Sequence, residues 1–314
     1  MQRTDNCSSV LVPDVVTPGG REDPMALVRL VRAGWLASYS DETTKLYGWS
    51  IDRWFEFLAV REVHPFDAIR AFLETFGKEL SRRGMMDSTV AKRMGHVKSF
   101  YKYAALEDFI DKDPMAHARV PKIDDDVLRP YLDRMELGRF LAAAEALPDS
   151  IRDRDRALAT LMAFTGLRIG GALSINIETI SQERGHHTAI AMTKNRKIIT
   201  VPLVPRVRRA IYMHIGERTE GPMFLGAEGR RLDRAVAYRR MARMAKLAGI
   251  DKKIGNHSLR RSFITDSLDA GVPLRDVQIS VHHKDARTTG RYDQQRRSLD
   301  NHAGYMLSAF IPGA

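Results

Sequence analysis

One stretch of this chain has no apolar periodicity, and it divides the sequence into two parts that have to fold separately. Residues 111–130 contain several prolines and the acidic run Asp124-Asp125-Asp126. Proline ends helices and is excluded from central strands, and a block of like charges has no face to bury. We therefore expect a linker at 116–130 between a domain at 25–115 and a second domain at 131–314. A chain of 314 residues is long enough for each domain to have its own hydrophobic core.

The first part has the period of amphipathic helices. Tyr47, Ile51, Trp54 and Leu58 recur with the spacing of one helix face. The same spacing returns after Ser88, which we interpret as an N-cap residue. The pattern predicts four helices that form a compact all-α domain, near 26–38, 41–60, 67–84 and 87–106.

The second part is also mostly helical, but its period changes once. The runs 188–192 and 198–203 have the character of short strands around the polar segment Lys194-Asn195-Arg196-Lys197, which predicts a β-hairpin. Helices are expected on both sides, with those after the hairpin at 206–216, 231–248, 257–269, 273–281 and 285–293. The predicted fold class is mainly α with a small β-sheet: an all-α domain followed by a mixed α+β domain.

The charge of the chain points to a polyanionic partner. The formal net charge is +11 and the pI is near 9.8, and we expect nucleic acid, although an anionic membrane surface would attract the same charge. The only cysteine, Cys7, cannot form an intramolecular disulfide, which fits a reducing cytoplasm. We see no run of 18 apolar residues and no secretory signal, so no membrane span is expected. Residues 1–24 are rich in Ser, Thr, Pro, Gly and Asp and are expected to form a flexible tail.

Three basic residues of the second domain are candidates for binding a phosphate. His257 and Arg260 are three positions apart, so a helix would place both on one face, with the guanidinium on phosphate oxygens and the imidazole exchanging a proton beside it. Arg168 follows a break in the helical pattern, where it has to be paired or face a cleft. Each also has a structural interpretation: a solvated helix end, or, for Arg168, an ion pair with Asp153 or Asp155.

Lys194 and Tyr292 are two further candidates. Lys194 lies at the expected hairpin tip, where a lysine provides either solvation or a mobile ammonium that protonates a leaving oxygen. Tyr292 is a weak nucleophile, because the unperturbed phenol pKa is near 10, and it needs neighbouring cations and a base. The usual fate of a helical tyrosine is a half-buried packing position. Together, however, these residue types are what is needed to hold and attack a phosphodiester.

The order and spacing of these residues resemble those of the tyrosine recombinases, the phage integrases. The shared series is Thr165-Gly166-Leu167-Arg168, Lys194, Val201-Pro202-Leu203, His257-x-x-Arg260, His283 and Tyr292. The gap of seven from Lys194 to Val201 and the gap of nine from His283 to Tyr292 are the usual ones in that family. The resemblance covers roughly residues 25–314, and it implies a core-binding domain at 25–115 and a catalytic domain at 131–314.

The chain departs from the family pattern at three places in the site, one of which is Arg261 where a histidine is frequent. The family usually has an acidic residue three positions after the first arginine, and here that position is Gly171. A supporting carboxylate is therefore missing or comes from elsewhere. The usual Leu-Gly before the second histidine is replaced by Val281-His282, so the choice of His283 over His282 depends on the gap to Tyr292.

The resemblance implies that Tyr292 is the nucleophile. It would attack the scissile phosphate of duplex DNA and leave a 3′-phosphotyrosine and a free 5′-hydroxyl. Arg168 and Arg260 would neutralise the non-bridging oxygens as negative charge builds up in the transition state. His257 would act as acid or base near the tyrosine.

The remaining roles follow from the same resemblance. Lys194 would be the general acid for the 5′-oxygen, and His283 would donate a hydrogen bond to the phosphate. The covalent link stores the bond energy, and cations replace a metal in stabilising the phosphate. We therefore expect no ATP, metal or other cofactor.

The protein also has to grip DNA, and basic residues on predicted helices of both domains are expected to contact phosphates. They are Lys92, Arg93, Lys98 and Lys102 in the first domain, and Arg230, Arg231, Arg234, Arg239, Arg243 and Lys246 in the second. By analogy with the family, the apolar segment 298–314 docks into a neighbouring protomer, with docking onto its own chain as the alternative. The expected partners are duplex DNA core sites, further copies of the chain and accessory directionality or DNA-bending proteins. We expect a monomer or dimer in solution and a homotetramer on DNA.

The predicted function is site-specific recombination that integrates or excises a mobile element, in the cytoplasm of a prokaryotic cell or of a phage-infected host. Because only about 24 residues precede the first domain, we expect no separate arm-binding domain. Type IB topoisomerases and telomere resolvases share the chemistry, but chain size and residue spacing argue against both.

Two other classes of protein compete with the recombinase. A DNA-binding regulator without catalysis is the alternative, and the presence of all the catalytic residue types counts against it. A metal site is disfavoured because the histidines match no zinc spacing. Those histidines are His186, His187, His257, His282 and His283.

Overall fold

The computed structural model describes residues 23–122, 130–193, 197–294 and 303–311. The chain divides into two compact units, Met1–Asp125 and Asp126–Ala314, and each unit has its own hydrophobic core. Almost all of the predicted tail and the central part of the predicted linker lie outside the described residues.

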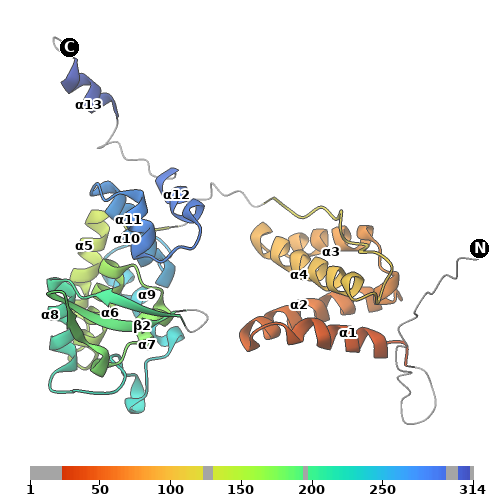
Figure 1. The fold of residues 1–314 in the computed structure, drawn as a ribbon, viewed down its shortest axis with the longest axis horizontal. Coiled ribbons are helices and arrows are strands. Elements are labelled where there is room, and N and C mark those ends of the chain that lie inside the picture. The colour runs from red at the N-terminus through yellow and green to blue at the C-terminus, as the bar shows by residue number, and fades with distance from the viewer. Residues whose placement is uncertain (1–22, 123–129, 194–196, 295–302, 312–314) are drawn as a thin grey trace, which may run out of the picture. The chain divides into compact units, whose positions relative to one another are not determined.

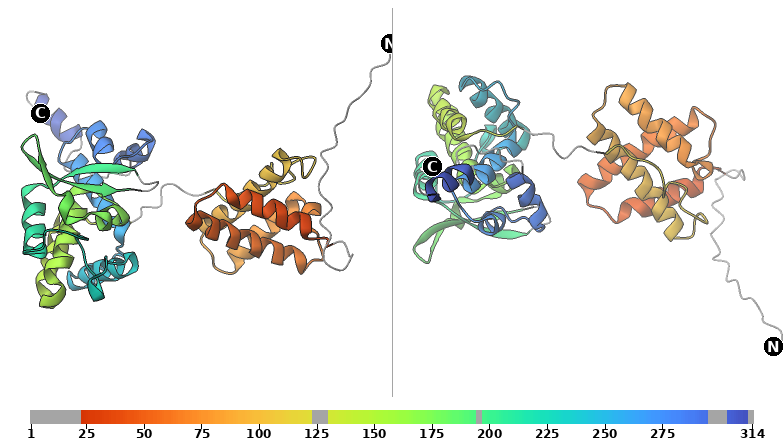
Figure 2. Two further views of the ribbon diagram at one scale, coloured as in Figure 1. Left: turned by 60° about the horizontal axis from the view of Figure 1, so that its bottom comes forward. Right: turned by 90° about the horizontal axis from the view of Figure 1, so that it is seen from above.

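Within residues 23–122, the first unit consists of four α-helices (Figure 1). They are α1 (Ala26–Ala37), α2 (Asp41–Ala59), α3 (Arg70–Arg82) and α4 (Asp87–Leu106), with the 3₁₀ turn η1 (Pro65–Asp67) before α3. Helix α4 packs against each of the other three. The bundle can be followed in two further views (Figure 2). The prediction of an all-α domain is confirmed.

Aromatic side chains fill the centre of this bundle. Trp35, Trp54, Phe100 and Tyr101 are fully buried. Trp54 Nε1 donates a hydrogen bond of 3.0 Å to the Tyr101 hydroxyl, which in turn donates one of 2.6 Å to the carbonyl of Pro65. Both ring polar atoms are therefore paired, and burying them costs little free energy.

The start of α4 differs from the prediction. The helix begins at Asp87, and Met86 precedes it with an extended backbone and no side-chain cap. Ser88 therefore lies inside the first turn, and its assignment as the N-cap residue was wrong. A carboxylate in the first turn still interacts favourably with the helix dipole.

The first unit extends past residue 115. Met115 and Ala118 are buried in its core. Lys98 Nζ donates hydrogen bonds of 3.0 and 3.1 Å to the carbonyls of Ala116 and Ala118. A few isolated apolar contacts and one lysine thus fix a segment whose sequence has no periodic signal.

The second unit contains one small antiparallel sheet. Its strands are β1 (Ser181–Glu183), β2 (His186–Met192) and β3 (Ile198–Pro202), and they pair in the order β1-β2-β3. Ala189 pairs with Val201 and Met192 with Ile198, so the predicted hairpin is confirmed. Strand β1 gives no signal in the sequence, because its three residues are polar and exposed.

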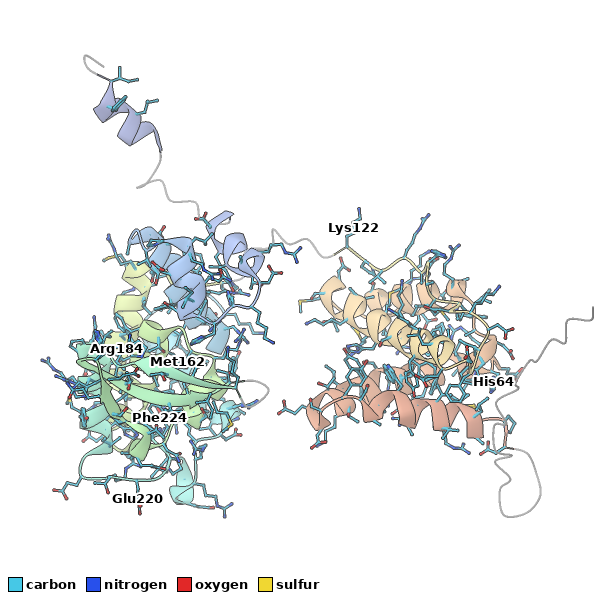
Figure 3. All side chains as sticks on the ribbon, viewed as in Figure 1. His64, Lys122, Met162, Arg184, Glu220 and Phe224 are labelled. Atoms are coloured by element: carbon cyan, nitrogen blue, oxygen red, sulfur yellow. The ribbon has the colours of Figure 1, made fainter. Side chains whose placement is uncertain are left out.

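The helices of this unit are α5 (Arg134–Ala142), α6 (Asp149–Thr165), α7 (Ile169–Ser174), α8 (Pro205–Ile215), α9 (Arg234–Leu247), α10 (Asn256–Asp269), α11 (Leu274–Ser280), α12 (Ala286–Gln294) and α13 (Ala303–Phe310). Helix α6 packs against α5, α7, α8, α9 and α10. The side chains of Met162 on α6 and of Phe224 are both fully buried in the core of the unit (Figure 3). The mixed α+β character predicted for this part is confirmed.

A smaller apolar cluster lies between α10, α11 and α12. It contains the buried side chains of Ile264, Leu268, Val277 and Val281. The ring of Tyr292 packs against this cluster. The packing holds α12 against the two helices that precede it.

Candidate active site

Arg260 is the centre of the candidate site. It lies on α10, one turn after His257, and only 4% of the residue is exposed. Its Nη1 donates a hydrogen bond of 2.6 Å to the carbonyl of Gly166, and its Nη2 donates one of 2.5 Å to the carbonyl of Val281. The first carbonyl ends α6 and the second ends α11, so one guanidinium ties three segments together.

The surroundings of Arg260 shift its pKa without removing its charge. Burial, together with the nearby charge of Arg168, lowers the pKa of Arg260 to about 10, while Tyr292 acts in the opposite direction. The guanidinium therefore stays protonated at neutral pH. A guanidinium has five N–H donors, so those not used by the two carbonyls remain available to an anion.

Arg168 is positioned by the break at the end of α6. Gly166 has a left-handed backbone with a φ of 62°. A Cβ atom at this position would be 2.5 Å from the ring of Phe263, so only glycine fits. Arg168 then begins α7 as its N-cap residue, with an exposed side chain.

The carboxylates considered as partners of Arg168 are engaged elsewhere. Asp153 pairs with Arg156 at 2.6 Å. Asp155 is fully buried and pairs with Arg154 at 2.8 Å and with Arg240 at 3.8 Å. The structural interpretation of Arg168 as an ion pair with either residue is therefore not supported.

His283 and Tyr292 lie side by side. Their rings are stacked, with a centroid distance of 6.3 Å and an interplanar angle of 16°. His283 Nδ1 is 2.9 Å from Oγ1 of Thr289, a fully buried residue of α12, and this hydrogen bond orients the imidazole. Burial and the charges of Arg260 and Arg168 lower the pKa of His283 to about 4. The imidazole is therefore neutral at neutral pH.

The β2–β3 hairpin is anchored next to α7. Ser174 Oγ accepts a hydrogen bond of 2.7 Å from Met192 N and donates one of 2.7 Å to the carbonyl of Gly171. A Cβ atom at Gly171 would be 3.8 Å from Met192 O, an ordinary van der Waals contact. A Cβ atom would therefore fit without a clash at the position where the expected carboxylate is missing.

The tip of the hairpin carries two lysines. Lys194 lies outside the described residues, and its role stays a prediction. Thr193 N donates a hydrogen bond of 2.8 Å to the carbonyl of Lys197 and closes the base of the tip. Burial and then the charge of Lys197 lower the pKa of His282, in the segment after α11.

Two residues that support the site are missing from the sequence prediction. Thr289 orients His283, and Gln278 Nε2 donates a hydrogen bond of 3.1 Å to the carbonyl of His283. Both contacts are made with His283 in the segment between α11 and α12, one from each helix. Neither residue has a spacing or type that could have revealed it.

Residues 130–298 match the family model described as the phage integrase family. The chain belongs to this family. Curated relatives are named tyrosine recombinases, and the chain is accordingly a tyrosine-type site-specific recombinase, an enzyme that cleaves and rejoins DNA.

Individual relatives agree with this assignment. The tyrosine recombinase XerC of Rhodospirillum centenum is 31% identical over 230 residues, which cover 71% of this chain and 65% of the relative. XerD of Bifidobacterium longum is 28% identical over 279 residues, which cover 84% and 90%.

Solved structures share the fold. A post-cleavage complex of the XerH site-specific recombinase with a palindromic difH substrate has a TM-score of 0.71 at 19% identity, covering 92% of this chain and 86% of that one. A lambda integrase tetramer bound to a Holliday junction has a TM-score of 0.69 at 18% identity, covering 88% and 78%.

The basic residues of the recombinase's second unit fall into two groups. Arg239, Arg243 and Lys246 are exposed on α9. Arg231, by contrast, donates hydrogen bonds to the carbonyls of Leu173 and Ile175 and so caps the end of α7. Its guanidinium therefore has a structural function, whatever it contributes to DNA binding.

Two neighbours of Arg231 also interact with the protein. Arg230 pairs with Glu228 at 3.2 Å on the surface. The Arg234 guanidinium lies against Gly170, where Nη2 would be 3.2 Å from an added Cβ atom.

The same division applies to the predicted DNA-binding residues of the recombinase's first unit. Lys92 and Lys102 are exposed on α4. Lys98 binds the two carbonyls described above, and the Arg93 guanidinium lies 4.2 Å from the ring centroid of Trp49. The basic residues that recur along this helix therefore include both solvated side chains and side chains that stabilise the fold.

Two negative observations concern only the part of the chain that the structure describes. No helix there has the length and apolar character needed to cross a membrane. No group of three or more His, Cys, Asp or Glu side chains there could hold a metal ion.

Proposed function

We propose that this recombinase is an integrase that cuts one DNA strand with Tyr292 and thereby integrates or excises a mobile element. The observation that carries the proposal is the stacking of Tyr292 on His283. The buried Arg260 holds the backbone just before His283 and just before Arg168, through the carbonyls of Val281 and Gly166. A phenol and an oriented imidazole are stacked there, and the charges of two guanidinium groups act on the imidazole. These are the groups needed to bind and attack a phosphodiester.

In the proposed first step, Tyr292 Oη attacks the scissile phosphorus and its proton passes to His257. The new bond is a 3′-phosphotyrosine, and the bond to the 5′-oxygen breaks. Lys194 protonates that oxygen as it leaves. Because the phosphodiester is conserved in the protein–DNA bond, the 5′-hydroxyl of a second strand reverses the step and joins the exchanged strands without ATP.

The cations have distinct functions in this step. Arg260 is fixed by protein carbonyls before DNA binds, so it neutralises a non-bridging oxygen with little reorganisation. Arg168 is exposed and closes on the phosphate from the other side. His283 is held by Thr289 and donates a hydrogen bond from its other nitrogen.

We further propose that phosphates of a duplex core site contact the solvated charges of each unit. On α4 the strongest candidates are Lys92 and Lys102, because their charged groups are exposed. On α9 they are Arg239, Arg243 and Lys246, for the same reason. Arg93, Lys98, Arg230, Arg231 and Arg234 stay in the proposed interface as residues that also hold its shape.

The active assembly we propose is a homotetramer on DNA, with accessory directionality or DNA-bending proteins where the site needs them. The lambda integrase tetramer on a Holliday junction supports this arrangement by analogy. Leu307 is 56% exposed and Phe310 is 83% exposed on α13. We propose that the segment 298–314 docks these apolar side chains into a neighbouring protomer. Deleting it should abolish synapsis while leaving cleavage of a single site.

The test of the proposed function uses a pool of nicked duplexes with randomised cores. Wild type should form a covalent adduct that survives denaturation, and Tyr292→Phe should bind the same DNA without forming one. Sequencing the captured strands then identifies the target as a mobile-element or a chromosomal site. Binding without an adduct in wild type would instead support the DNA-binding regulator. An adduct in Tyr292→Phe would exclude this tyrosine as the nucleophile.

A further inference from the structure

The end of α11 has an unusual residue in a common turn. His282 N donates a hydrogen bond of 2.9 Å to Ile279 O, and His283 N donates one of 3.1 Å to Gln278 O. This pair of bonds is the Schellman motif, and its left-handed position is usually glycine. Here that position is His282, with a φ of 53°.

Other helix ends of the chain show what this position normally requires. The same pair of hydrogen bonds follows α3, α9 and α10, and there the left-handed residues are Gly84, Gly249 and Gly271. After α2 it is Glu62, with a φ of 56°. A side chain in this conformation is strained, because its Cβ approaches the backbone carbonyl. Strain of this kind at a functional site suggests that the side chain itself is used.

The neighbours of His282 belong to the candidate active site on both sides. The carbonyl of Val281 holds the Arg260 guanidinium at 2.5 Å. The ring of His283 stacks on Tyr292. The exposed imidazole of His282 is therefore displayed at the edge of the site, between the residue that fixes the arginine and the residue that faces the tyrosine.

The charges of cations from three different elements act on this imidazole. After burial, the charges of Lys197, Arg260 and Arg168 lower the pKa of His282. They come from the base of the β2–β3 hairpin, from α10 and from the start of α7. The shift favours the neutral imidazole, which still has one N–H donor for an anion bound among these cations.

We propose that His282 is a further phosphate-binding residue, whose imidazole donates a hydrogen bond to a phosphate of the cleaved DNA strand. This rests on the proposed function only in naming DNA as the source of the phosphate. His282 and His283 then bind from adjacent backbone positions with different geometry: one from a strained turn at the rim, the other from a ring fixed by Thr289. The left-handed backbone is what directs the first imidazole outward while the second stays inside.

The decisive variant is His282→Gly, because it removes the imidazole and relieves the backbone at the same time. We expect a melting temperature equal to or above that of wild type, and adduct formation on the captured duplex slowed about 10-fold. The matched control is Glu62→Gly, which relieves the same turn in the other unit and should leave the adduct rate unchanged. His282→Asn tolerates the left-handed backbone and keeps a donor, so it should recover part of the rate. A normal rate in His282→Gly overturns the proposal, and so does a rate loss accompanied by a lower melting temperature.

A second measurement does not depend on cleavage. The imidazole resonances of the intact protein are followed while inorganic phosphate is added, and His282 is assigned as the signal absent from His282→Gly. We expect a saturable shift of this signal that is lost in Arg168→Ala, since the same cations hold the anion. No shift at saturating phosphate overturns the proposal, even if wild type forms the adduct. A shift without any adduct in wild type leaves the phosphate site standing and refutes the proposed function alone.

Discussion

The inner and outer parts of the candidate site position their basic side chains in opposite ways. On the inner side, Arg260 is buried and donates to two backbone carbonyls, so its position is set by folding. On the outer side, Arg168, His282 and Lys197 are exposed and lie on a turn, a helix end and a hairpin. The comparison suggests a rigid half that defines where the phosphate sits and an adjustable half that closes on it. Mutations on the two sides should therefore affect stability and activity differently.

The largest effect is expected for Arg260→Ala. Adduct formation should fall by at least about 10³-fold, because a fixed charge at the transition state is lost. The melting temperature should fall as well, since two buried carbonyls lose their donor at about 1–3 kcal/mol for an unsatisfied group. Thermal unfolding and a denaturing-gel assay of the adduct measure both effects. Wild-type stability in this variant would show that the guanidinium does not tie the three segments together.

Arg168→Ala should separate the two effects. We expect adduct formation to fall about 10²-fold, while the melting temperature stays that of wild type because the side chain is exposed. Arg168→Lys keeps the charge but loses the forked geometry, and should recover only part of the rate. A clear drop in stability in Arg168→Ala would contradict the assignment of this arginine to the adjustable half.

Thr289→Val tests how the inner imidazole is oriented. The valine has nearly the same shape but cannot bond His283 Nδ1, so we expect cleavage to slow about 10-fold through misorientation of the ring. DNA affinity should not change, which gel shifts can verify. Thr288→Val, the exposed neighbour on α12, provides the control and should behave like wild type. Equal rates for both variants would remove Thr289 from the site.

The smallest effect is expected for a carboxylate behind the site on α10. Burial, and then the charges of Asp269 and Asp133, raise the pKa of Asp266 to about 7. A raised folded-state pKa gives stability that is complete below the unfolded pKa, near 4, and is lost as pH rises through about 7. Asp266→Asn should therefore melt a few degrees above wild type at pH 8, and the difference should shrink steadily as the pH falls towards 4. A difference that does not change with pH would show that Asp266 titrates normally.

The sequence supports the fold further than the details of the site. Four amphipathic helices, the hairpin and the break at Gly166 follow from period, turn chemistry and glycine geometry, and the structure confirms them. The spacing of Arg168, Arg260 and Tyr292 also indicates the enzyme class correctly.

Other features could not be predicted, because they depend on contacts between distant segments. The carbonyls that hold Arg260, the bond from Thr289 and the capping function of Arg231 have no local signature. The basic stripes show the same limit, since the sequence cannot distinguish a solvated lysine from Lys98, whose ammonium binds two carbonyls.

The most direct test of the central claim is to locate the covalent bond. The adduct is digested with nuclease and trypsin, and the peptides are sequenced by mass spectrometry. Cleavage after Arg291 releases a short peptide that begins with Tyr292. We expect this peptide alone to carry a nucleotide through a 3′-phosphate on the phenol. A nucleotide on any other residue, or a 5′-phosphate linkage on Tyr292, would contradict the proposed mechanism.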